Sequence, residues 1–472
     1  MSRSYEGEEG EKTALEPENP AITTDLIDLA LDLDSQGRYE EAELLYKRVL
    51  EIFEEALGSE HPDTATALEN LAKNVNEQGK YSEAEPHFKR VLEIRKKKLG
   101  SGHPNTATAL ENLALNLNKQ GRLSEAELHL KKALSIRKSI FGPEHIDTAI
   151  SLHNLAKNLD WQGRHSEAER LYKRELMIKK KLLEPEHPNI AECLNNLAAS
   201  AVHQGKYSEA EPLLKRAIKI YEKELGPEHP NIISALHNLA KSLDNQSRYS
   251  EAEPLYKRVL GIYEKEQEPD HIYAATVLNN FAGNLRKQGS RDLEAEPLLK
   301  RAIKIYEKEL GPDHPDTGTV MNNLALNLRT QGRYSEAEVL CRRAVKIKDK
   351  EIGQEDVSTA ASLHNLAMIL DGQGRYAEAE PVFKRVLEIF SELFGSEHPY
   401  AATALHGLAA NLDGQGRYAE AEPLFKRAVE IRVKRLGPEH PETVESLDKL
   451  VSCLETQGKH SEAEKFRERY IK

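Results

Sequence analysis

Apolar residues recur along the chain with the spacing of two short amphipathic helices, followed by a loop. In residues 63–99 the first apolar set has members three and four apart, namely Leu68, Leu71, Ala72 and Val75. A second set with a similar spacing follows, namely Ala84, Phe88, Val91 and Ile94. Because this spacing places each set on one side of a helix, the stretch predicts two helices that each bury one face.

Turn signals lie between the two predicted helices and after the second. Gly79 follows the first apolar set, where a glycine commonly ends a helix. The segment "SEAE" (82–85) has the form of a capping box, which predicts that Ser82 caps the second helix and Glu85 reaches back to it. Gly100 closes the second helix, and the following loop ends in His103-Pro104. Each unit is therefore predicted to be a helix, a tight turn, a second helix and a loop.

The same unit recurs through the chain at a nearly constant period. The residue that opens each unit stands at His61, His103, His145, His187, His229, His271, His314, Asp356, His398 and His440. Eight of the nine spacings are 42 residues and one is 43. Glutamine, then usually glycine, then a basic residue forms a second landmark, from Gln36 to Gln457. A fixed period of this size is typical of a solenoid, in which each unit buries its apolar face against its neighbours.

The period divides the chain into a short tail and one long repeat region. Residues 1–20 are acidic and predict a disordered tail. Residues 21–472 predict an all-α solenoid of about eleven helix-turn-helix units. The unit boundaries are approximately 22–60, 61–102, 103–144, 145–186, 187–228, 229–270, 271–313, 314–355, 356–397, 398–439 and 440–472.

The repeat resembles a known family. Its apolar, glycine and tyrosine positions follow the order and spacing of a tetratricopeptide repeat (TPR), with extra residues in the second helix and its loop. The phrases "LNNLA", "QGRYSEAEPLYKRVL" and "LGPEHP" resemble the repeats of kinesin light chains. The resemblance covers residues 22–472. It implies a right-handed superhelix whose first helices line a concave, peptide-binding groove.

Composition narrows the class of protein further. A net charge of −12 argues against a general attraction to nucleic acid or to anionic membranes. No apolar run approaches the ~20 residues of a membrane span, and residues 1–20 lack the apolar core of a signal peptide. The three scattered cysteines, Cys193, Cys341 and Cys453, support neither a disulfide framework nor a zinc cluster. These features predict a soluble protein of the reducing cytoplasm.

The histidines are the first candidates for chemistry. Those that open successive units lie about one repeat apart, so they do not converge on one metal ion. Each precedes a helix start, and Asp356, a common capping residue, replaces one of them. Capping is therefore favoured over metal binding. A catalytic residue should interrupt the repeat, because a reaction needs one site. The sequence contains no cluster of reactive residues that interrupts the repeat in one place. We therefore predict no enzyme activity, no metal and no cofactor.

An asparagine slot in the first helix of each unit is the better functional candidate. It reads Asn70, Asn112, Asn154, Asn196, Asn238, Asn280, Asn323 and Asn365, and the terminal units lose it. An amide carries a donor and an acceptor, so it can bond the main chain of a peptide of any sequence. By resemblance to kinesin light chains, this ladder is a peptide-binding strip. The alternative is that each asparagine bonds the neighbouring unit and fixes the stacking of repeats.

Charged residues near this slot complete the predicted peptide-binding groove. The basic ones are Lys73, Lys157, Lys241, Arg286, Lys287 and Arg329. Such positions suit acidic side chains of a peptide, although a solvated helix face is the commoner explanation for any single one of them. Asp160, Asp244, Asp371 and Asp413 are expected to add negative charge beside them.

The resemblance implies a non-enzymatic cargo adaptor that binds protein or peptide partners and associates with a microtubule motor and the cytoskeleton. The sequence departs from the kinesin light chain pattern in one respect that concerns binding to a motor. Kinesin light chains carry a heptad coiled coil before their repeats, and the residues before the first unit here contain no such pattern, so no residue supports a kinesin heavy chain partner. The alternative function is a regulatory or assembly scaffold without a motor.

Overall fold

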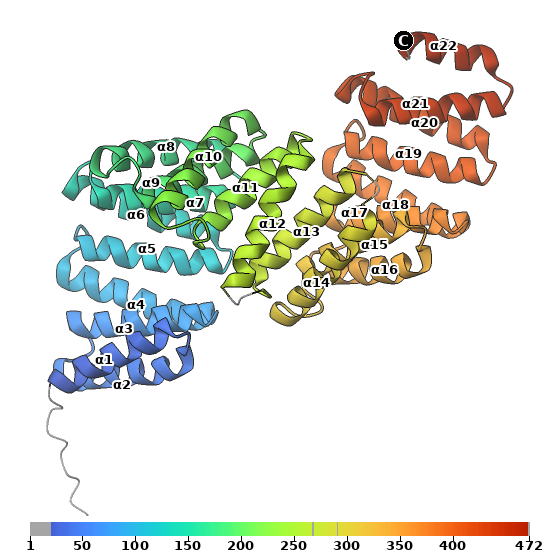
Figure 1. The fold of residues 1–472 in the computed structure, drawn as a ribbon. Coiled ribbons are helices and arrows are strands. Elements are labelled where there is room, and N and C mark those ends of the chain that lie inside the picture. Colours follow the sequence, from blue (N-terminus) through green and yellow to red (C-terminus); the bar gives the residue numbers. More distant parts are fainter. Residues whose placement is uncertain (1–19, 267–268, 290, 471–472) are drawn as a thin grey trace, which may run out of the picture. The chain divides into compact units, whose positions relative to one another are not determined.

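The computed structural model describes residues 20–266, 269–289 and 291–470, and every regular element in these ranges is an α-helix (Figure 1). Residues 1–19 of the predicted tail lie outside them, whereas Pro20 already belongs to the first helix. The chain divides into two compact units, Met1–Pro227 and Glu228–Lys472, called unit 1 and unit 2 below. From here on, each helix pair of the sequence pattern is called a repeat. The predicted all-α solenoid of about eleven helix pairs is confirmed.

Each helix pair consists of an odd-numbered and an even-numbered helix. Unit 1 contains α1 (Pro20–Ser35), α2 (Tyr39–Leu57), α3 (Pro62–Glu77), α4 (Tyr81–Leu99), α5 (Pro104–Lys119), α6 (Leu123–Phe141), α7 (Ile146–Trp161), α8 (His165–Leu182), α9 (Pro188–His203) and α10 (Tyr207–Glu224). Unit 2 contains α11 (Ile232–Asn245), α12 (Tyr249–Lys265), α13 (Ile272–Lys287), α14 (Asp292–Glu309), α15 (Pro315–Thr330), α16 (Tyr334–Glu351), α17 (Val357–Gly372), α18 (Tyr376–Phe394), α19 (Pro399–Gly414), α20 (Tyr418–Leu436), α21 (Pro441–Thr456) and α22 (His460–Tyr470).

The predicted helix boundaries at the glycine turn and at the histidine are confirmed. After α3, Gly79 has a φ of +78°, and the amide of Lys80 donates to the carbonyl of Val75. This is the glycine-ended helix terminus expected there. At the start of α5, His103 Nδ1 accepts from the Asn105 amide at 3.1 Å. Asp356 accepts from Ser358 in the same way. The histidines that open the repeats are therefore helix caps, except His229, because α11 begins only at Ile232.

The capping-box prediction is wrong. The helix α4 begins at Tyr81, and its flanking residue Lys80 makes no side-chain capping bond, so Ser82 lies inside the first turn. Glu85 does not fold back onto the helix start, because its carboxylate is bound elsewhere. It lies 2.6 Å from Lys89 Nζ and accepts from Gln120 and Arg122 of the next repeat at 3.0 and 2.6 Å.

This glutamate joins each repeat to the next one. The hydrogen bond from Lys89 contributes most to lowering the pKa of Glu85 to about 2, and Gln120 and Arg122 lower it further against the opposing effect of burial. The same junction, between a glutamate and the glutamine and basic residue of the following repeat, forms at Glu43, Glu127, Glu169, Glu253, Glu296, Glu338, Glu380 and Glu422. The "SEAE" and "QGR" signatures are therefore two halves of one contact between repeats.

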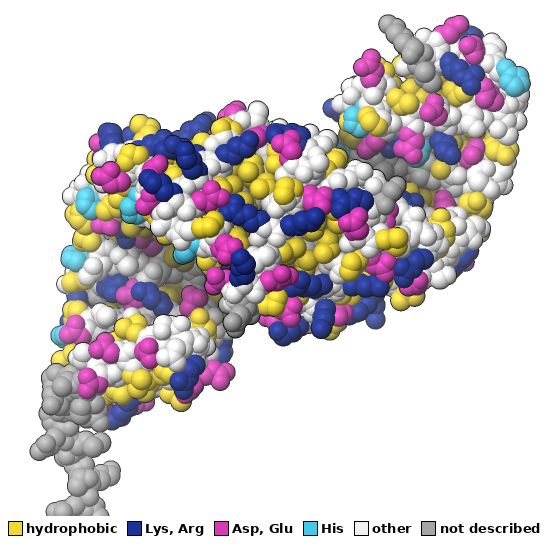
Figure 2. Space-filling view, in the orientation of Figure 1, with side chains coloured by type: hydrophobic (Ala, Val, Ile, Leu, Met, Phe, Trp, Pro, Cys, Tyr) yellow, Lys and Arg dark blue, Asp and Glu magenta, His cyan; other side chains and the backbone are white. Residues whose placement is uncertain are grey.

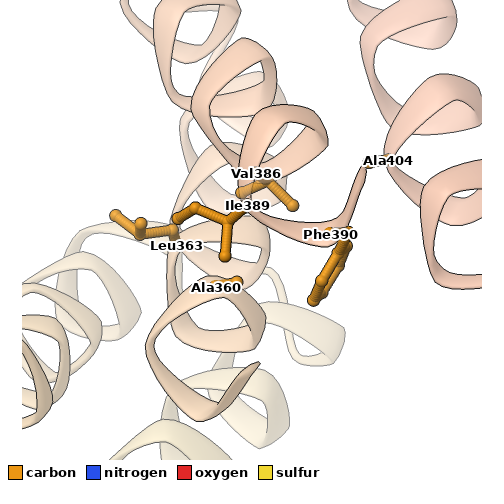
Figure 3. Close-up of a cluster of buried hydrophobic side chains, with 6 residues drawn as sticks. All are labelled: Ala360, Leu363, Val386, Ile389, Phe390 and Ala404. Atoms are coloured by element: carbon orange, nitrogen blue, oxygen red, sulfur yellow. The ribbon is translucent and has the colours of Figure 1, made fainter. Parts of the chain in front are cut away.

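Within a compact unit, the apolar stripes pack an even-numbered helix between the two odd-numbered helices that flank it, as at α18. In Figure 3, Val386, Ile389 and Phe390 of α18 lie among residues of α17 and α19. Ala360 and Leu363 come from α17, and Ala404 comes from α19. Within unit 2, α13, α15, α17 and α19 also contact one another in sequence, as α5 and α7 do in unit 1, whereas even-numbered helices of neighbouring described repeats make no comparable contact. The odd-numbered helices therefore form the inner face of each unit.

Gly407 occupies the asparagine slot of α19 for a steric reason. A methyl group at Gly407 would lie 2.7 Å from Phe383 Cε1 and 3.1 Å from His364 Cε1. We expect Gly407→Ala to destabilise the protein by about 1–3 kcal/mol, because overpacking outweighs the helix propensity that alanine adds. At Gly283, in the middle of α13, an added methyl group would meet no other atom within 4 Å. Gly283→Ala is the matched control and should stabilise by up to ~1 kcal/mol in urea unfolding. Equal effects of the two changes would contradict the steric explanation.

Candidate functional site

The predicted asparagine ladder lies on the odd-numbered helices of both units. All eight asparagines are half-buried. Four of them donate to the residue before the asparagine slot of the preceding repeat. Asn280 Nδ2 lies 2.8 Å from His237 Nε2, and Asn323 and Asn365 donate to Asn279 and Asn322 at 2.8 and 3.2 Å. Asn112 donates to Glu69. At these four positions the side chain bridges neighbouring repeats.

Three asparagines of unit 1 differ from these four. The side-chain amides of Asn70, Asn154 and Asn196 make no hydrogen bond to any residue in the described ranges. The would-be acceptor explains the difference for Asn154. Glu111, which precedes the slot of α5, is bound to Arg137 and Ser151. An unpaired, half-buried amide on the inner face retains both its donor and its acceptor for a ligand.

The predicted basic residues fall into two groups. Lys73, Lys157 and Lys241 are exposed, and the first two lie one helical turn after unpaired asparagines. Lys73 Nζ is 3.4 Å from Glu69. Lys157 Nζ lies 5.3 Å from the ring centre of Trp161, the half-exposed last residue of α7.

In unit 2, Arg286 and Arg329 are half-buried on α13 and α15, and the exposed Lys287 lies over the Tyr249 ring at 5.8 Å. Acidic and basic side chains are interspersed over the visible surface rather than segregated (Figure 2). The basic residues are therefore local features and do not form one continuous field.

A second ladder, which sequence reasoning missed, lies four residues after the first. Its asparagines are almost fully buried, and each donates to a backbone carbonyl at the start of the preceding even-numbered helix at 2.9–3.0 Å. They are Asn74, Asn116, Asn158, Asn284, Asn327 and Asn411. The recurrence of a second asparagine can be seen in the sequence. The sequence does not show that its side chain is buried against the preceding repeat. This ladder holds the repeats together.

The aspartates expected to add negative charge to the groove serve this second ladder instead. Asp244 accepts from Asn284 at 2.5 Å and from the Tyr256 hydroxyl at 2.8 Å. Asp371 accepts from Asn411 at 2.6 Å, and burial raises the pKa of its carboxyl to about 6. Asp160 is bound by Ser200 and His165. These three carboxylates therefore support contacts between repeats.

The remaining chemical candidates are structural. His237, His364 and His406 pack among side chains of neighbouring helices, and burial is the main cause that lowers the pKa of each to about 4. In unit 1, the buried carboxylate of Glu175 contacts Lys179, His153 and the thiol of Cys193. Across the described residues no group of three histidine, cysteine or acidic side chains is arranged to hold a metal ion. Nor does any helix there have the length and apolarity to cross a membrane.

A repeated helix pair with a shared inner face and with contacts only between neighbours defines a helical-repeat protein of the solenoid class. The tetratricopeptide-repeat family matches residues 20–97, 76–139, 105–181, 159–223, 189–265, 273–350, 358–432 and 414–472. The chain belongs to the tetratricopeptide-repeat family, as its sequence predicted. Such solenoids are typical of proteins that bind other proteins.

Among solved structures, the chain is similar to a putative kinesin light chain of nearly identical TPR-like repeats from Podosopora anserina. The two are 29% identical over 44% of this chain and 98% of that one, with a TM-score of 0.39. BtubC (BKLC) from P. vanneervenii is 22% identical over 44% of this chain and 82% of its own, with a TM-score of 0.40. The apo form of RapI is 16% identical over 61% and 98%, with a TM-score of 0.48. No curated protein matches the chain.

Proposed function

We propose that this protein is an adaptor that binds extended segments of partner proteins on the inner face of unit 1. The observation that carries the proposal is the set of unpaired amides at Asn70, Asn154 and Asn196, on α3, α7 and α9. Each amide bonds peptide main chain without requiring a particular sequence. Lys73 and Lys157, one turn further along their helices, supply charge that favours acidic side chains in the bound segment.

The bridging asparagines serve a different purpose from the binding ones under this proposal. Asn280, Asn323 and Asn365 spend their donors on the preceding repeat. The proposal therefore assigns peptide binding to some positions of the asparagine slot and contacts between repeats to others.

Replacing the three unpaired asparagines together is expected to weaken peptide binding at least about tenfold, because several hydrogen bonds of about 1 kcal/mol each are lost. The melting temperature of Asn70→Ala/Asn154→Ala/Asn196→Ala should stay near that of the wild type. The peptide is obtained by selecting a random-peptide phage library on the wild-type chain, and its affinity is measured by fluorescence anisotropy.

The matched control is Asn323→Ala/Asn365→Ala, which removes two bonds between repeats. This variant should melt at a lower temperature and bind the selected peptide nearly as well as the wild type does. If the unit 1 variant instead loses stability and keeps its affinity, the unpaired asparagines are structural and the proposal is wrong.

The finer form of the proposal is a cargo adaptor for a microtubule motor. The similarity of the repeats to those of kinesin light chains supports it. A pull-down with purified kinesin heavy chain tests this form directly. Retention of the heavy chain favours the motor adaptor, whereas its absence from the bound fraction favours a regulatory or assembly scaffold that uses the same face.

A further inference from the structure

Two arginines interrupt the second ladder in unit 2. In other repeats the residue two positions after the second-ladder position accepts a bond from the following repeat. Asn76 and Asn118 accept in this way at 3.0 and 2.6 Å, and Asp371 does so at 2.6 Å. In α13 and α15 the equivalent residues are Arg286 and Arg329. An arginine side chain cannot accept a hydrogen bond, so each substitution removes a bond between repeats.

In the repeats that follow the two arginines, the donor that would bond to that position either has another acceptor or is absent. Asn327, which would otherwise donate to the residue at position 286, donates to the carbonyl and the carboxylate of Asp292 at 3.0 and 3.1 Å. In the next repeat the buried donor is absent altogether, and the apolar Ile369 takes its place. Stacking of the repeats therefore does not account for the arginines.

The positive charges of this pair are not fully compensated by the described residues, because one carboxylate, that of Asp292, serves the pair. Arg286 Nε is 3.6 Å from Asp292, a carboxylate already bound by Asn327. No carboxylate lies within salt-bridge distance of Arg329 in the described ranges. The Nε atoms of both arginines are buried and have no hydrogen-bond partner there. A guanidinium in this condition carries an unrecovered desolvation cost.

The two guanidinium groups also repel each other. Their helices, α13 and α15, are in contact on the inner face of unit 2. Burial lowers the pKa of Arg286, and the charge of Arg329 lowers it further, while Asp292 opposes both. On the next odd-numbered helix, the charge of Arg329 adds to burial in lowering the pKa of His364.

We propose that Arg286 and Arg329 form the binding site for a phosphoryl group on a phosphorylated segment of a partner protein. A phosphomonoester carries a charge of about −1.5 to −2 and three acceptor oxygens, so it neutralises two guanidinium groups, whereas one carboxylate neutralises only one. Arginine forks bond such oxygens in pairs. Leu326 and Met368, half-buried on α15 and α17, offer apolar contact to residues beside the phosphorylated one. The inference deepens the proposed function and rests on it only in assigning the phosphoryl group to a polypeptide.

The test compares degenerate peptide libraries with a central phosphoserine, serine or glutamate for binding to the full chain. The wild type should retain the phosphoserine library at least about tenfold better than the serine library. Arg286→Gln and Arg329→Gln should each abolish that preference. The matched control, Arg343→Gln, makes the same change on the even-numbered helix α16, where Arg343 already pairs with Glu307 at 2.9 Å, and it should keep the preference.

Thermal melting separates a binding role from a structural one. Without ligand, Arg329→Gln should melt at or above the wild-type temperature, because it removes an uncompensated charge. The phosphoserine library should raise the wild-type melting temperature and leave that of Arg329→Gln unchanged. A lower melting temperature of unliganded Arg329→Gln, or equal retention of the serine and phosphoserine libraries, overturns the inference. Equal affinity for inorganic phosphate and the phosphoserine library overturns the assignment to a protein segment.

These outcomes are distinguishable from failure of the proposed function. If Asn70→Ala/Asn154→Ala/Asn196→Ala binds its selected peptide normally while phosphoserine binding still depends on the arginines, the inference stands and the unit 1 surface is wrong. If the asparagines govern binding of the selected peptide and no phosphoserine preference exists, the inference alone fails.

Discussion

Glu175→Ala is expected to destabilise unit 1 by about 3–5 kcal/mol, because it leaves a buried cation without its carboxylate. Glu175 is fully buried in α8, and its Oε1 lies 2.8 Å from Lys179 Nζ, whose residue is only 5% exposed. His153 Nδ1 and Cys193 Sγ approach the same oxygen at 3.2 and 3.0 Å. Burial opposes the charged form of Glu175, yet His153 and Lys179 outweigh it and lower the pKa of the carboxyl.

Two further variants distinguish an ion-pair effect from simple loss of volume. Glu175→Leu/Lys179→Met removes both charges at similar volume and should recover most of the lost stability. Glu125→Ala breaks an exposed pair with Arg122 and should leave urea unfolding close to that of the wild type. A double variant as unstable as Glu175→Ala would show that packing dominates over the unpaired charge.

The second large effect is a loss of stability as the pH falls from 7 to 5. His237, His364 and His406, all in unit 2, have pKa values of about 4 because burial disfavours their charged form. In the unfolded chain a histidine titrates near 6.5, so between these values the unfolded state binds more protons and stability falls with falling pH. Each histidine contributes a loss of about 2 kcal/mol between pH 7 and pH 5.

Asp371 works in the opposite direction, and this provides a control. Burial raises its pKa to about 6, so the folded state takes up a proton first and gains stability as the pH falls. Urea unfolding at several pH values should therefore show a flatter dependence for His364→Gln and a steeper one for Asp371→Asn. Asparagine already fills the equivalent position at Asn118, where it accepts from Asn158. Unfolding free energies that do not change between pH 7 and pH 5 would contradict the assignment.

Much of the fold follows from local patterns in the sequence. The apolar spacing and Gly79 mark helix faces and ends because those signals depend on contacts within a few residues. The capping-box prediction failed for Glu85 because its partners, Gln120 and Arg122, come from the next repeat. Helix periodicity does not show whether such a carboxylate binds the start of its own helix or side chains of the next repeat.

The candidate site was predictable in position but not in role. The asparagine slot lies on the odd-numbered helices, yet Asn280 and Asn154 are equivalent in sequence and differ in their side-chain bonds. The difference arises from the acceptor offered by the preceding repeat, since Glu111 is already bound by Arg137 and Ser151. In the same way, the sequence alone indicates that Asp371 is a surface charge, whereas the structure shows that it accepts a hydrogen bond from Asn411 of the next repeat.

The junction at each repeated glutamate has a consequence for how the chain acquires its structure. Its partners lie 35 and 37 residues ahead at Glu85, and the same separations recur at Glu127 and Glu380. Loops of constant length close at a constant entropic cost, however long the chain becomes. Folding can therefore nucleate at any neighbouring pair of repeats and spread outward, with the low contact order that is associated with fast folding. Adding or removing one whole repeat should change how far this growth proceeds more than how fast it begins.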